Sequence, residues 1–146
     1  MAERVALDGG TPPGTEIASL TMPPITRHTL ALYCGASGDH NPIHVDIDFA
    51  KRAGFPDVFA HGMLVMAYLG NLLTHIAPVE RHRSFSTRFQ AITQLGDAIT
   101  CTATLQSIGE QDGVPVATLA LTARDQTGEV KLAGDAVVVL AEGDNR

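Results

Sequence analysis

Apolar and polar residues alternate along the C-terminal half of the chain, which is typical of strands with one buried face. The alternation is clearest over residues 98–108, where Ile99, Cys101, Ala103 and Leu105 share one side. Glycine-containing breaks separate this segment from its neighbours and are typical of hairpins. We therefore predict an antiparallel sheet, with strands over residues 16–22, 84–93, 98–108, 114–124 and 129–141.

Residues 62–77 lack this alternation and are apolar almost without interruption, with Pro78 directly after them. About 16 residues form a helix of roughly 24 Å, and a helix that is apolar on all sides is a buried one. The pattern therefore predicts a long helix enclosed by the sheet.

Two shorter helices are predicted before it. Thr26 is placed to cap a helix that runs through Cys34 and ends at Gly35. Asp46 is placed to cap a second helix over residues 47–53, with Gly54 after it.

One strand, a buried helix and four further strands give an α+β chain with the order of a hot-dog fold, in which an antiparallel sheet wraps around a long central helix. Residues 1–15 are rich in Gly and Pro and are expected to form a loose N-terminal lead-in, with one domain over residues 16–146. A single sheet around one helix leaves edges and apolar surface uncovered, so we expect a homodimer.

Composition narrows the class of protein. The 146 residues are 45% hydrophobic, which is enough for a core, and the net charge of −6 argues against nucleic acid as a partner. No apolar segment is long enough for a membrane span, and the N-terminus has no apolar signal sequence. The two cysteines lie in apolar segments and are expected to be reduced and buried. We expect a cytoplasmic protein.

The candidate chemistry lies between residues 33 and 63. Asp39 and His44 flank an Asn-Pro turn, and on a regular helix they would point about 140° apart. Pro42 disfavours a continuous helix, so the pair is expected on an irregular loop, where a carboxylate and an imidazole can converge on one water molecule. If Gly62 opens the long helix, its N–H has no partner within the helix and suits an oxygen that gains negative charge.

These residues form the pattern Gly-Asp-x-Asn-Pro-x-His over residues 38–44, followed by His61-Gly62-Met63. The pattern resembles that of the MaoC-like family of (R)-specific enoyl-CoA hydratases and 3-hydroxyacyl dehydratases, enzymes of fatty-acid metabolism. The resemblance implies that Asp39 and His44 hold the water that adds to a trans-2-enoyl thioester. It also implies that the Gly62 N–H polarises the thioester carbonyl, while Asn41 shapes the turn and supports His44.

The resemblance also bears on substrate binding. Many members carry a hydroxyl residue where this chain has Gly70, which leaves the length of the acyl group open. Met66, Tyr68 and Leu69 are candidates for lining an acyl tunnel, although a place in the core is the favoured interpretation of each. Arg88 is one of several cations that could bind the phosphates of the carrier. No cofactor is expected beyond the coenzyme A or acyl carrier protein that forms part of the substrate.

Several alternatives remain open from the sequence. Asp39 could serve only the turn, and His44 could be an ordinary loop histidine. A metal site is the next alternative, with the candidate ligands Asp39, His40, His44, Asp46 and Asp48. No metal is expected, because Asp46 and Asp48 are better explained as charges at the start of a helix. His61 is expected to be a helix-entry or packing residue. At the level of function, the competitors are a hot-dog acyl-CoA thioesterase and a non-catalytic acyl-binding subunit.

Overall fold

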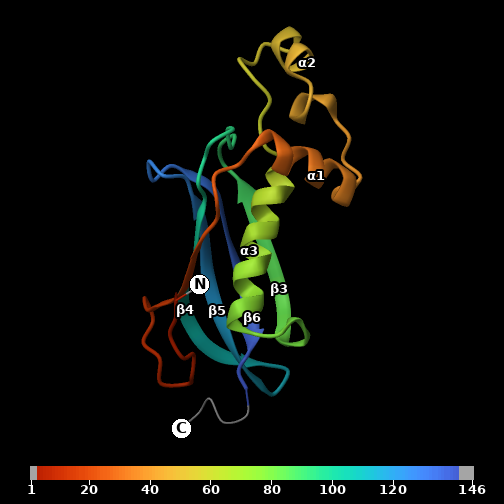
Figure 1. The fold of residues 1–146 in the computed structure, drawn as a ribbon. Helices are drawn as coiled ribbons and strands as arrows, with labels where there is room; N and C mark the ends of the chain where they lie inside the picture. Colours follow the sequence, from red (N-terminus) through yellow and green to blue (C-terminus); the bar gives the residue numbers. More distant parts are fainter. Residues whose placement is uncertain (1–2, 142–146) are drawn as a thin grey trace.

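A single antiparallel sheet dominates the protein in a computed structural model that describes residues 3–141. The sheet has six strands in the order β1-β2-β4-β5-β6-β3 and curls around the helix α3 (Figure 1). The strands are β1 Glu3–Arg4, β2 Glu16–Thr21, β3 His82–Phe89, β4 Thr100–Gln111, β5 Val114–Arg124 and β6 Val130–Val139. The hot-dog arrangement predicted from the sequence is confirmed. Residues 1–2 of the predicted lead-in and 142–146 of the predicted domain lie outside the described part.

The predicted alternation in β4 is confirmed, because Ile99, Cys101, Ala103 and Leu105 are all buried. Two other predictions need correction. Within the segment expected to be a loose lead-in, Glu3 and Arg4 pair with Ser19 and Ala18 of β2.

The strand predicted over residues 84–93 ends earlier, at Phe89. Beyond it, the N–H groups of Gln90 and Ala91 both bond to the carbonyl of Lys131, at 2.9 and 3.3 Å. Because two successive donors share one acceptor, the regular ladder stops there and the chain leaves the sheet.

The central helix α3 runs from Gly62 to Ile76 and ends next to the 3₁₀ turn η2, Val79–Arg81. One side of α3 packs in the core through Leu64, Val65, Leu69, Leu72, Leu73 and Ile76. The prediction that it is buried on all sides is wrong for the single chain. Met63 is 53% exposed, and Ala67 and Thr74 are also exposed along the same side. One sheet covers only one side of a helix, so this face remains open. Among the described residues, no helix is long and apolar enough to cross a membrane.

Residues 27–58, which we name the helical cap, connect β2 to α3 and lie at the N-terminal end of α3, beyond the sheet (Figure 1). They contain α1 Arg27–Ser37, the 3₁₀ turn η1 Pro42–His44 and α2 Ile47–Arg52. The side chains of Arg27 and Asp57 form an ion pair of 2.6 Å that joins the two ends of the cap.

Both predicted N-caps are confirmed, since the side chain of Thr26 accepts from the N–H of Thr29 and that of Asp46 accepts from two N–H groups of α2. The predicted end of α1 at Gly35 is wrong. The helix continues to Ser37 and ends at Gly38, whose φ of 74° is left-handed. Helices tolerate an internal glycine at a modest cost, whereas a left-handed end strongly favours one, and only Gly38 meets that need.

Candidate active site

The loop that follows α1 is shaped by its own side chains. The Asp39 carboxylate accepts a hydrogen bond from the N–H of Asn41 at 3.2 Å. The Asn41 side chain then accepts from the N–H of Ile43 at 3.1 Å, and its carbonyl accepts from the N–H of His44. Pro42 occupies the first position of η1, where its missing N–H costs nothing. Asn41 thus shapes the turn and holds His44 through the backbone rather than through its side chain.

His44 is held in one orientation. Its ring is 8% exposed, and its Nδ1–H donates to the carbonyl of Phe59 at 2.7 Å. The ring of Phe59 also meets it edge-on, with centroids 5.4 Å apart. Because a carbonyl can only accept, Nδ1 carries the hydrogen and Nε2 keeps the lone pair. The second nitrogen of His44 is therefore a base.

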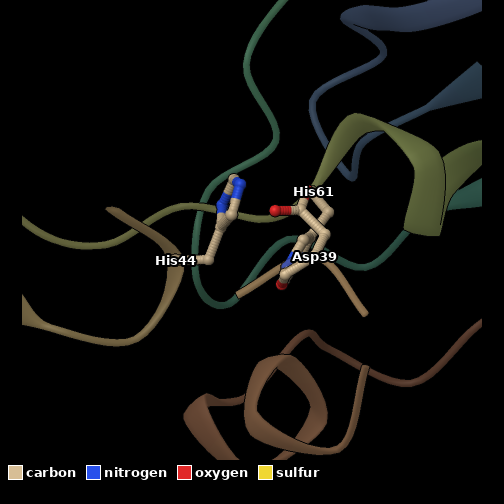
Figure 2. A group of neighbouring side chains, drawn as sticks. All are labelled: Asp39, His44 and His61. Carbon is tan, nitrogen blue, oxygen red and sulfur yellow. The ribbon is translucent and has the colours of Figure 1, made fainter. Parts of the chain in front are cut away.

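Asp39, His44 and His61 converge (Figure 2): one polar side-chain atom of each lies within 4.8 Å of those of the other two. The prediction that a folded loop brings Asp39 and His44 together is confirmed. Three atoms no more than 4.8 Å apart share a point within about 2.8 Å of each, which is the length of a hydrogen bond to water. Asp39 is exposed and the two histidines are buried, so this point lies between solvent and the protein interior.

His61 is the member of this cluster that was expected only as a helix-entry or packing residue. It lies at the N-cap of α3 and is 2% exposed, in agreement with a helix-entry residue. Its ring also stacks on that of His44, with centroids 3.8 Å and planes 25° apart, and it meets Tyr33 edge-on at 4.8 Å. The signal available in the sequence was its place directly before Gly62.

The protonation of His61 follows from its neighbours. Its Nε2 lies 3.3 Å from the backbone carbonyl of Asp39 and 3.5 Å from Sγ of Cys34. Since the carbonyl can only accept, Nε2 donates, and the lone pair lies on Nδ1, which is buried and has no partner among the described residues. Burial, and then the nearby His44, lower the pKa of His61. His61 is therefore neutral near pH 7. In contrast, burial and the nearby Asp39 charge raise the pKa of Tyr33.

The five residues considered from the sequence as metal ligands do not all come together in the structure. Asp46 caps α2 through bonds from the N–H groups of Asp48 and Phe49, and Asp48 lies in the first turn, as expected for helix-start charges. His40 is exposed and lies outside the three-residue cluster.

Gly62 is the first residue of α3, as predicted, so its N–H has no acceptor within the helix and lies at the positive end of the helix dipole. It borders a cleft of about 360 Å³. The cleft is lined by Phe59, Ala60, Gly62, Phe89, Gln90, Ala91, Ile92 and Thr93. A Cβ at position 62 would lie 2.8 Å from two ring carbons of Phe89, so a larger residue fits here only if this ring moves. Phe89 was not predicted as a site residue.

The helix residues predicted to line an acyl tunnel lie elsewhere. Leu69 is completely buried in the core, and Met66 and Tyr68 are half-buried against it. Gly70 faces the ring of Phe85, with 3.7 Å between that ring and the position a Cβ would take. None of the four lines the cleft beside Gly62.

Arg88 does not line that cleft either. It is exposed on β3 and borders a different hollow of about 480 Å³, on the face of the sheet formed by β3, β5 and β6. The carboxylate of Asp135 lies in the same hollow and accepts a hydrogen bond from Ser86.

Known proteins are similar to this chain in sequence and in fold. Residues 9–125 match the MaoC like domain. The chain is 32% identical over 121 residues to an (R)-specific enoyl-CoA hydratase of Rhodospirillum rubrum, with 80% of each protein covered. It is 30% identical over 113 residues to the (R)-specific enoyl-CoA hydratase of Aeromonas caviae, with 76% of this chain and 83% of that one covered.

The solved structure of an (R)-hydratase from A. caviae involved in PHA biosynthesis superposes with a TM-score of 0.78, covering 91% of this chain and 99% of the other at 27% identity. The cluster at the entrance to α3, the fold and these relatives lead to one conclusion: the chain belongs to the MaoC-like family of hydratases and dehydratases.

Proposed function

We propose that this protein catalyses the reversible hydration of trans-2-enoyl thioesters to (3R)-hydroxyacyl thioesters. The observation that carries the proposal is the convergence of Asp39, His44 and His61 within 4.8 Å, at the end of α3 where Gly62 presents its N–H. The similarity to two (R)-specific enoyl-CoA hydratases supports the same reaction.

In the proposed mechanism, Asp39 and the Nε2 of His44 hold one water and draw a proton from it as its oxygen bonds to C3 of the substrate. The thioester carbonyl accepts a hydrogen bond from the Gly62 N–H. This donor, together with the helix dipole, stabilises the negative charge that the carbonyl oxygen gains. The proton then passes to C2 on the same face, so that water adds across the double bond in the syn sense. Dehydration follows the same steps in reverse.

The acyl group must lie beside Gly62 for this geometry to work. The apolar cleft next to it, with Phe89 and Ile92 in its walls, is where we place the reacting end of the substrate. The carrier is a coenzyme A or acyl-carrier-protein thioester, and the protein needs no further cofactor.

We further propose that the protein works as a homodimer in the cytoplasm. The exposed side of α3, including Met63, and the outer edge of β3 are surfaces that a second copy would cover. Sedimentation velocity at micromolar protein concentration tests this, and a monomer with full activity would contradict it.

The decisive test is the consumption of trans-2-enoyl-CoA by Asp39→Asn and His44→Ala, with the stereochemistry of the product determined. General acid–base groups contribute about 10² to 10⁴-fold to a rate, so each variant is expected to lose at least that much. His40→Ala is the matched control, because His40 is a neighbouring histidine outside the cluster.

Retention of more than about a tenth of the rate in both variants would remove these residues from the mechanism. Release of free thiol from an acyl-CoA, without hydration, would assign the fold to a thioesterase instead. Activity that appears only after a second, different chain is added would identify this chain as one subunit of a heteromer.

A further inference from the structure

Each of the three side chains in the Asp39 cluster has an atom that offers an electron pair. The Asp39 side chain is a carboxylate, and each histidine has one nitrogen committed to donating to a backbone carbonyl: His44 to Phe59 at 2.7 Å and His61 to Asp39 at 3.3 Å. The remaining nitrogens are lone-pair atoms, since a neutral imidazole carries a single hydrogen. A water molecule can donate to only two of three acceptors, whereas a cation satisfies all three.

The arrangement around the histidines is the one that metal-binding imidazoles have. A ligating histidine usually donates its other N–H to a carbonyl or carboxylate, which fixes the ring and its tautomer. Both His44 and His61 do so. In addition, the Nδ1 of His61 is buried without a partner among the described residues, on a side chain that is 2% exposed.

We propose that Asp39, His44 and His61 bind one Zn²⁺ ion per chain, and that the ion occupies the position of the reacting water and so inhibits the enzyme. Two imidazoles and one carboxylate form a ligand set that suits Zn²⁺ and does not suit Mg²⁺, which requires oxygen ligands. Binding rests on the identity and proximity of these three side chains, and only the inhibition rests on the proposed function.

The cost of binding is also visible in the structure. The two rings are stacked, with centroids 3.8 Å and planes 25° apart, so their lone pairs lie in nearly parallel planes. One ring must turn to bring both nitrogens to about 2.0–2.1 Å from a single ion. This rearrangement, together with only three protein ligands, gives a micromolar, reversible site rather than a permanent structural one.

The test is isothermal titration of the full chain with ZnCl₂, after treatment with EDTA and desalting. One Zn²⁺ per chain is expected at a micromolar dissociation constant, with no comparable signal from Mg²⁺. Asp39→Asn and His61→Gln are expected to weaken binding about tenfold or more. Because Asp39 is exposed, the first variant removes a ligand with little effect on folding. His40→Gln is expected to bind as the wild type does.

Absence of saturable one-to-one binding, or unchanged affinity in Asp39→Asn, overturns the proposal. A Cys34→Ser variant guards against a thiol site, because Sγ of Cys34 lies 3.5 Å from His61: loss of binding in Cys34→Ser but not in Asp39→Asn would also overturn it. In parallel, Zn²⁺ should inhibit enoyl-CoA hydration by the wild type at the concentrations that saturate the titration. Zn²⁺ binding without any hydration of enoyl-CoA would contradict the proposed function but would still support the metal site.

Discussion

Lys131 is a buried lysine surrounded by acids, and replacing it with methionine is expected to destabilise the fold strongly. Lys131 is 3% exposed, and its Nζ donates to the carbonyl of Ile92 at 3.0 Å. It forms ion pairs with Asp125 at 3.3 Å, with Asp97 at 3.6 Å and with Glu129. Methionine keeps the length of the side chain but leaves these carboxylates without their cation.

The size of the effect follows from these contacts. Removing one partner of a buried ion pair costs about 3–5 kcal/mol, because the other charge stays buried. The lower end applies here, since the Glu129 side chain is 57% exposed and Asp125 also accepts from the N–H groups of Thr127 and Glu129. We expect the free energy of unfolding to fall by about 3 kcal/mol and the melting temperature by about 10 °C.

Urea unfolding, followed by circular dichroism at one fixed protein concentration, measures this change. Lys51→Met is a matched control, because Lys51 is the only other lysine in the chain and is exposed on α2. It is expected to change stability by no more than about 0.5 kcal/mol. A loss below about 1 kcal/mol in Lys131→Met would show that the acids do not depend on this cation.

Three further predictions concern glycines and acid. Gly62→Ala places a Cβ 2.8 Å from the Phe89 ring and is expected to lower kcat/KM for enoyl-CoA at least tenfold. The urea midpoint should be nearly unchanged, because the Phe89 ring is 55% exposed and can move. An unchanged kcat/KM would show that the reaction does not depend on the close approach of substrate to Gly62. Gly134→Ala is expected to prevent folding or lower the melting temperature sharply, because its Cβ would lie 1.9 Å from a backbone oxygen of β3. The control Gly35→Ala should be neutral or stabilising, because the space around its Cβ is open and the residue lies inside α1. Equal melting temperatures of the two variants would contradict the predicted clash at Gly134. Hydrogen bonds, above all from Thr127, lower the pKa of Asp125 to about 2, below its unfolded value of about 3.9. The stabilising contribution of the Asp125 carboxylate is therefore complete above the unfolded pKa and is lost as the pH falls towards 2. In urea unfolding from pH 5 to pH 2, the stability of Asp125→Asn should fall less steeply than that of the wild type.

The sequence was most informative where one physical requirement acts alone. Strict alternation placed β4 on the correct face, and the side chains of Thr26 and Asp46 marked two helix starts, because a cap is a local interaction. The turn built by Asn41 and Pro42 is equally local, which is why the convergence of Asp39 and His44 was predictable.

Features that depend on distant parts of the chain were not predictable in this way. The strand β3 ends at Phe89 because two later N–H groups bond to Lys131. The ring of Phe89 lies beside Gly62, and no local pattern indicates this contact. His61 joined the cluster through its contact with His44, which is 17 positions earlier in the chain.

The helical cap has a consequence for how this protein fails on heating. Asp39 and His44 belong to the cap, whereas His61 and Gly62 belong to the start of α3, so the site exists only while the two parts are docked. The docking is uneven: α1 buries Leu30 and Cys34, whereas α2 buries only Ala50 of its residues, and the ion pair that closes the cap joins two partly exposed side chains. Regions with few buried contacts open at lower free energy than the core. We therefore expect the part of the cap around α2 to detach first on heating, so that activity is lost before the sheet melts.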